Sequence, residues 1–98
     1  MTITKKLDND ALTLSLEGRL DTMTAPELEA ELKQSLENVN TLTLDFSRLE
    51  YISSAGLRVL LSAHKLMSAK GSMTVTHVNE IVREVFDVTG FADILHIA

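Results

Sequence analysis

The sequence predicts an α/β fold built on a mixed β-sheet of four to five strands, with an N-terminal hairpin and about three crossover or closing helices. Apolar and polar residues alternate at residues 11–17, 41–46 and 72–78, and this two-residue period is typical of strands with one buried face. Helical patterns separate the runs, which favours parallel strands joined by right-handed crossovers. The 98 residues, 45% of them apolar, suffice for one compact domain over residues 1–98 and are too few for two.

The hairpin is predicted at the start of the chain. Residues 2–7, TITKKL, can pair with ALTLSLE at residues 11–17, and the cluster of Asp8, Asn9 and Asp10 between them is a turn signal. An antiparallel pair here would make the otherwise parallel sheet mixed.

The first helix is predicted after this hairpin. Thr24 and Glu27 have the spacing of a capping box, and Pro26 falls in the first turn, where proline is well tolerated. The apolar residues that follow at three- and four-residue steps are Leu28, Leu32, Leu36 and Val39. This spacing would place them on one helical face, against the sheet.

Two further helices are predicted from their end signals. An apolar-rich segment runs from residue 57 to about residue 70 and is closed by Gly71. Asn79 can cap a shorter helix that Gly90 ends. The last residues, FADILHIA at 91–98, are predicted to form a final strand or an extended tail.

Composition argues against several classes of partner and location. The net charge is −5, and the basic residues are scattered apart from Lys5 and Lys6, so no basic stripe is available for nucleic acid. The chain has no cysteine and no apolar run near 18 residues. We therefore expect no disulfide, no membrane insertion and a cytoplasmic location.

The histidines do not have the spacing of a metal site. His64, His77 and His96 lie 13 and 19 residues apart, so no pair would project two imidazoles from one helical face. We expect neither a metal ion nor a cofactor.

The stretch YISSAGLRVL, residues 51–60, is the candidate functional segment. It resembles a nucleophile elbow but lacks the glycine two residues before Ser54. It also resembles a loop that holds phosphate at a helix start, yet no nucleotide-binding glycine motif is present. Two interpretations of the serines remain open, namely ordinary helix capping and modification of Ser54.

Modification would suit the position of Ser54. If Ser54 is the N-cap, its hydroxyl is exposed at the start of the helix, where a phosphoryl group would be stabilised by the helix dipole. Arg58 is one turn further along the same face and could pair with the phosphate.

Three segments together resemble the STAS domain, the fold of bacterial anti-sigma factor antagonists. They are DFSRLEYISSAGLRVLL at residues 45–61, LSLEGRLDTMTAPELEAEL at 14–32 and VNEIVREVFDVTGF at 78–91. The residues that carry the resemblance are Gly18, Leu20, Asp21, Asp45, Ser47, Ser54, Gly56 and Leu57. It covers nearly the whole chain.

The resemblance implies a protein that binds other proteins and is not an enzyme. Antagonists of this family bind an anti-sigma factor that is also a serine kinase, are released when it phosphorylates them, and are reset by a separate serine phosphatase. The serine that matches their phosphorylation site is Ser54, with Ser53 as the second choice. The resemblance implies a partner surface of Asp21, Thr22, Ser53, Ser54, Ala55, Gly56 and Arg58.

Two positions depart from the family pattern. Ser53 stands where the family often has aspartate, and Ala55 stands where it often has serine or threonine. An alternative function is that of an accessory subunit of a lipid transport complex, because some small STAS proteins are associated with lipid transporters. Such a subunit would not be phosphorylated. A third class is an esterase or a phospho-aspartate receiver. The receiver is disfavoured because no early strand ends in the acidic cluster that holds its magnesium ion, and the esterase because His64, the histidine nearest to Ser54 in the sequence, would lie almost three turns along the following helix.

Overall fold

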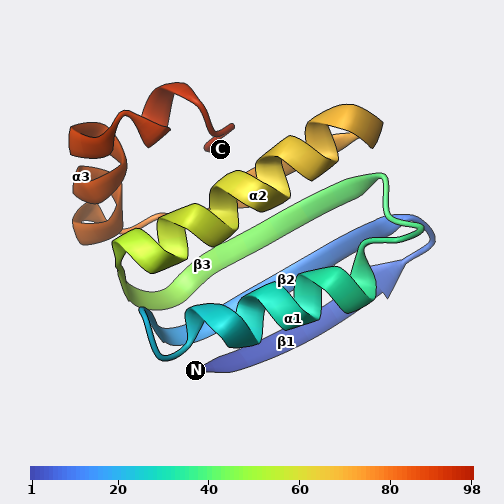
Figure 1. Cartoon of the computed structure of the whole chain (residues 1–98), viewed down its shortest axis with the longest axis horizontal. Helices are drawn as coiled ribbons and strands as arrows, with labels where there is room; N and C mark the ends of the chain where they lie inside the picture. Colours follow the sequence, from blue (N-terminus) through green and yellow to red (C-terminus); the bar gives the residue numbers. More distant parts are fainter.

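The computed structural model describes residues 1–98 and has a mixed sheet with strand order β1-β2-β3-β4 (Figure 1). β1 and β2 are antiparallel, and β2, β3 and β4 are parallel. The elements along the chain are β1 (Thr2–Asp8), β2 (Ala11–Leu20), α1 (Ala25–Ser35), β3 (Thr41–Ile52), α2 (Ser54–Lys70), β4 (Ser72–Thr76), α3 (Glu80–Thr89) and the short 3-10 helix η1 (Phe91–Asp93). The predicted mixed α/β architecture is confirmed.

The N-terminal hairpin turns where the sequence predicted. Asp8 pairs with Ala11, so only Asn9 and Asp10 form the turn. Asn9 has a positive φ of 56°, a conformation that asparagine tolerates better than most residues.

The third strand is longer than the alternating run at residues 41–46. β3 continues to Ile52, and its pairing with β2 shifts twice, between Ser15 and Glu17 and between Gly18 and Arg19. The buried residues of β3 therefore change from steps of two, ending at Phe46, to Leu49 and then Ile52. A β-bulge of this kind inserts an extra residue and breaks the period on which strand prediction depends.

The two long helices lie side by side on one face of the sheet (Figure 1). Apolar residues of the strands face them and form one core, whose largest fully buried members are Phe46, Phe86, Leu12, Leu14, Leu16, Leu20, Leu28, Leu42, Leu44, Leu49, Ile52 and Leu60. The intervening strand residues are polar, and Thr13, Thr43 and Thr74 are neighbours in the register on the other face. None of the helices is both long and apolar enough to cross a membrane.

The first helix differs from its prediction at both ends. α1 begins after Thr24, but the Thr24 side chain makes no capping bond to the helix, so the predicted capping box is wrong. α1 also stops at Ser35, and Leu36 and Val39 are buried beyond its last turn. The Lys70 ammonium group at the end of α2 donates to the Leu36 carbonyl, which joins the ends of the two helices.

The third helix has the predicted caps. The Asn79 side-chain oxygen accepts a hydrogen bond from the Val82 amide at 2.8 Å, and its amide nitrogen donates to the Leu49 carbonyl at 2.8 Å. Gly90 ends the helix with a positive φ of 83°. Of the predicted final strand, only one parallel bridge forms, between Ile97 and Val75.

Gly71→Ala is expected to lower the free energy of unfolding by about 1–3 kcal/mol, the usual cost of overpacking. A methyl group at Gly71 would overlap the carbonyl oxygen of Asn40. That carbonyl cannot retreat freely because it accepts the Ser72 amide at 2.9 Å. Urea denaturation would measure the loss, with Ser72→Ala as the exposed neighbouring control, and equal stability of the two variants would contradict the explanation.

Candidate functional site

Two loops meet where β2 and β3 end. Leu20 and Ile52, the last residues of these parallel strands, are paired in the register. The Ser53 amide then donates to the Leu20 carbonyl at 2.9 Å. The turn that begins at Asp21 and the serine segment are therefore held together, as the resemblance implied.

The two serines have different places at the start of α2. Ser53 is the N-cap, with extended φ and ψ of −102° and 176°, and Ser54 is the first residue of the helix. The expectation that Ser54 is the N-cap is therefore wrong by one residue. Either serine suits a helix start chemically, so the sequence alone did not separate them.

The serines also differ in access to solvent. The Ser54 side chain is on the exposed surface, whereas the Ser53 hydroxyl oxygen is buried and has no hydrogen-bond partner. No side chain caps the first turn of α2, so its amide groups stay available to an anion beside Ser54. A modifying enzyme could reach Ser54 far more easily than Ser53.

Gly56 brings the first turn of α2 close to the strand ends. It is buried, and a Cβ atom there would lie 2.7 Å from Leu20 Cγ and 2.8 Å from Ile52 Cγ1. Glycine at this position therefore keeps Ser54 next to the loop at Asp21, and its contribution is spacing rather than a polar contact.

Asp21 organises the neighbouring loop through its carboxylate. Oδ1 accepts the Met23 amide at 3.0 Å and the Thr24 amide at 3.2 Å. The Asp21 amide in turn donates to the Thr24 hydroxyl at 2.9 Å. Asp21 thus satisfies the amide that a capping side chain would otherwise bind, which is why the Thr24 and Glu27 capping box does not form.

The loop holds Asp21 in its charged form. Partial desolvation works to raise the pKa of Asp21, but hydrogen bonds from Thr24 and Met23, with the nearby charge of Arg19, outweigh it and keep the pKa below its usual value. Arg19 Nε lies 3.7 Å from Asp21 Oδ2, and its guanidinium is 4.6 Å from the centroid of the Tyr51 ring. The carboxylate is therefore negative throughout the physiological pH range.

Thr24→Val is expected to raise the pKa of Asp21 towards its ordinary value. The substitution removes a hydroxyl that lies 3.3 Å from Asp21 Oδ1 and shares its single proton between this oxygen and the Arg19 carbonyl at 2.7 Å. Because the folded-state pKa is depressed, the stability that this carboxylate contributes is present above its unfolded pKa and is lost as the pH falls through the folded value. Carboxyl-detected NMR titration would measure the pKa, and an unchanged value would contradict the proposed role of the hydroxyl. Thr22→Val is the control.

A hollow between α1 and α2 adjoins the serine segment. Its lining residues are Thr22, Ala25, Pro26, Glu29, Ala55, Arg58, Val59 and Ser62. Of the residues predicted as a partner surface, Thr22, Ala55 and Arg58 thus share one hollow, while Gly56 is buried beneath the surface.

The α1 side of this hollow was absent from the predicted site. Pro26 and Glu29 come from α1, and neither was among the residues predicted to form the partner surface. Ser62 continues the exposed stripe of Ser54 and Arg58 on α2, and Val59 lies four residues after Ala55, so a helical-face search starting from Ala55 could have found Val59. No sequence signal named α1 as the helix opposite.

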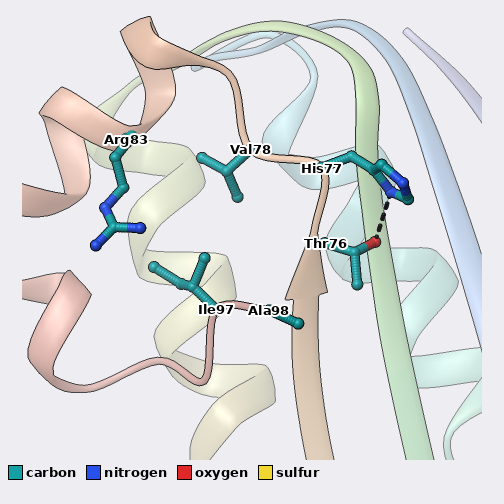
Figure 2. A pocket seen from close by; sticks show the side chains of 6 residues that line it. All are labelled: Thr76, His77, Val78, Arg83, Ile97 and Ala98. Carbon is teal, nitrogen blue, oxygen red and sulfur yellow. Dashed lines mark hydrogen bonds between the residues drawn. The ribbon is translucent and has the colours of Figure 1, made fainter.

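A second hollow lies at the end of β4 and is lined by Thr76, His77, Val78, Arg83, Ile97 and Ala98 (Figure 2). His77 turns towards Thr76, and its Nδ1 atom is 3.2 Å from Asp45 Oδ1. The Ser47 amide is the main cause that lowers the pKa of Asp45, which desolvation opposes, and His77 adds to the lowering. Asp45 accepts a hydrogen bond from the Ser47 amide at 3.0 Å and so stabilises β3 where its register shifts. It is not among the residues around Ser54.

The chain belongs to the STAS domain family. The family model described as "Mlab, STAS domain" matches residues 3–96. BtrV of Bordetella bronchiseptica, provisionally named an anti-sigma factor antagonist, is 38% identical over 100 residues, covering 100% of this chain and 86% of BtrV. The anti-sigma-B factor antagonist of Bacillus subtilis is 28% identical over 95 residues, covering 96% of this chain and 86% of the relative.

Solved structures confirm the fold. An anti-sigma factor antagonist from Mycobacterium paratuberculosis superposes with a TM-score of 0.88 at 22% identity, covering 98% of this chain and 83% of that one. The phosphorylated form of SpoIIAA from Bacillus superposes with a TM-score of 0.77 at 20% identity, covering 99% of this chain and 91% of that one. The likeness extends over nearly the whole fold, including the strand ends that carry the serine segment.

Proposed function

We propose that this protein is an anti-sigma factor antagonist that binds an anti-sigma factor with serine kinase activity and is switched off by phosphorylation of Ser54. The observation that carries the proposal is the exposed Ser54 at the uncapped start of α2. The names of the relatives BtrV and the anti-sigma-B factor antagonist support the partner class. A serine phosphatase would restore the binding form, and both reactions would take place in the cytoplasm.

Phosphorylation would change the surface without refolding the domain. The γ-phosphoryl group of ATP would be transferred to Ser54 Oγ, with release of ADP and of the hydroxyl proton. The product carries about −1.5 to −2 charges at neutral pH. The dipole of α2 stabilises that charge in the free protein, but a partner that covers the serine would have to desolvate it. The phosphorylated form is therefore expected to dissociate.

Intact-mass measurement with fragmentation tests the modification. The protein would be incubated with ATP and the candidate serine kinases of the same genome. We expect one added phosphate, located on Ser54, and no phosphate on Ser54→Ala. Phosphate on Ser53 would contradict the site assignment, and no phosphate with any kinase would contradict the switch.

The alternative function is an accessory subunit of a lipid transport complex. It agrees with the same fold and with an exposed surface at α1 and α2, but it does not require phosphorylation. Copurification with a transport ATPase, together with an unmodified Ser54 under all conditions, would favour this function over the proposed one.

A further inference from the structure

The hollow beside Ser54 continues between α1 and α2 as far as Leu36 and Leu66. A neighbouring hollow between the same two helices shares three lining residues with the hollow beside Ser54, namely Glu29, Val59 and Ser62. Its other lining residues are Leu32, Lys33, Leu36, Ala63 and Leu66. The two form one groove, which we call the α1–α2 groove. Its floor is apolar, and Leu66 at its far end is 51% exposed, so an apolar group could be buried there.

Of the charged side chains that line this groove, two form a salt bridge and one, Arg58, does not. Glu29 pairs with Lys33, whose Nζ atom lies 3.6 Å from Glu29 Oε1. Arg58 forms no salt bridge with any carboxylate of the protein and is exposed at the end of the groove near Ser54. The groove therefore offers a free guanidinium beside an apolar floor, which complements a carboxylate beside an aliphatic or aromatic side chain.

Arg58 can also reach the serine. It follows Ser54 by four residues, one helical turn, and helical side chains lean towards the N-terminus. Its guanidinium can therefore turn either towards the groove or back towards Ser54. A phosphate on Ser54 would form stronger, charge-assisted hydrogen bonds with it than the solvent does.

We propose that the α1–α2 groove binds an apolar side chain and a neighbouring carboxylate of the anti-sigma factor, and that Arg58 is the cation for which this carboxylate and phosphorylated Ser54 compete. The inference rests on the proposed function. It extends the contact surface from the serine segment to Leu66 and assigns Arg58 the task of transmitting the modification to the groove. Phosphorylation would then weaken binding for two reasons. It adds a charge at Ser54 that the partner must desolvate, and it pairs Arg58 with the phosphate, so that Arg58 is no longer available to the partner's carboxylate.

The contact of Arg58 with phosphorylated Ser54 can be tested without a kinase or a partner. Phosphoserine would be installed at position 54 during translation, and the phosphate would be titrated by phosphorus NMR. Since a nearby cation favours the dianion, we expect the phosphate pKa to be about 0.5–1 units lower in the parent protein than in Arg58→Gln. Lys65→Gln, an exposed charge change on the same helix, should leave it unchanged. An equal pKa in the parent and Arg58→Gln would overturn the role of Arg58.

The groove can be tested with the kinase identified by the mass measurement. Isothermal titration with unphosphorylated protein and without ATP should show about tenfold weaker binding for Arg58→Gln and for Leu66→Ala, equivalent to about 1.4 kcal/mol each. Leu7→Ala, an exposed apolar truncation on β1, should bind normally. Full affinity of Leu66→Ala would overturn the groove as the contact surface.

The outcomes separate this inference from the proposed function. If Ser54 is phosphorylated but Arg58→Gln and Leu66→Ala bind as the parent does, the switch stands and the groove is wrong. If no kinase modifies Ser54, the proposed function fails, whereas the phosphorus titration still decides whether Arg58 can hold a phosphate there. Sedimentation should show a monomer, and a dimer that Leu66→Ala dissociates would replace the partner by a second copy of this chain.

Discussion

Ser54→Asp is expected to bind the anti-sigma factor at least about a hundredfold more weakly than Ser54→Ala, a difference of about 2.7 kcal/mol. The alanine variant keeps a neutral, exposed helix start that a partner can cover, and it cannot be phosphorylated. The aspartate variant places a permanent charge at the first position of α2. The helix dipole stabilises that charge in the free protein, and the partner must desolvate it on binding.

Isothermal titration of both variants would measure this difference in the absence of ATP. Ser68→Asp is a matched control, because it adds the same charge at an exposed serine near the other end of α2. Ser68→Asp should bind within about twofold of the parent. Position 68 is 14 residues from position 54 on the same helix, and the effect of a charge is largely screened beyond a Debye length of about 10 Å. Equal affinities of Ser54→Asp and Ser54→Ala would rule out Ser54 as the switch.

The core of this fold could be predicted because its signals are local. Alternation in the strands at residues 11–17 and 41–46 requires one buried face, and Asn79 followed by an apolar stripe requires a capped helix. The structure confirms both features. Such signals depend on neighbours a few residues apart, so tertiary contacts did not need to be known.

The features that sequence reasoning missed depend on contacts between distant segments. β3 continues past Phe46 because it remains paired with β2 across two register shifts, and these shifts remove the alternation that would have shown it. The capping box is the exception, because Asp21 lies only three residues before Thr24 and its carboxylate binds the Thr24 amide in place of Glu27, which is a local competition. The α1–α2 groove exists only once two helices lie side by side, so no spacing within either helix could identify it.

Phe86→Ala is expected to lower the free energy of unfolding by about 3–5 kcal/mol, the largest loss of stability that we predict. Phe86 is fully buried, and its ring centroid lies 6.4 Å from that of Phe46 on β3, with an interplanar angle of 37°. Truncation would remove this aromatic contact and leave a cavity between α3 and the sheet. Urea denaturation would measure the effect.

Val88→Ala provides the matched control on the same helix. Val88 is 77% exposed, so its truncation should change stability by no more than about 0.5 kcal/mol. A loss of less than about 1.5 kcal/mol for Phe86→Ala would mean that the sheet holds α3 by other contacts, such as the bond from Asn79 to the Leu49 carbonyl. Because neither residue lines the groove beside Ser54, both folded variants should bind the anti-sigma factor with the parent affinity. A stability loss without an affinity loss would show that Phe86 and Val88 lie outside the surface that binds the partner.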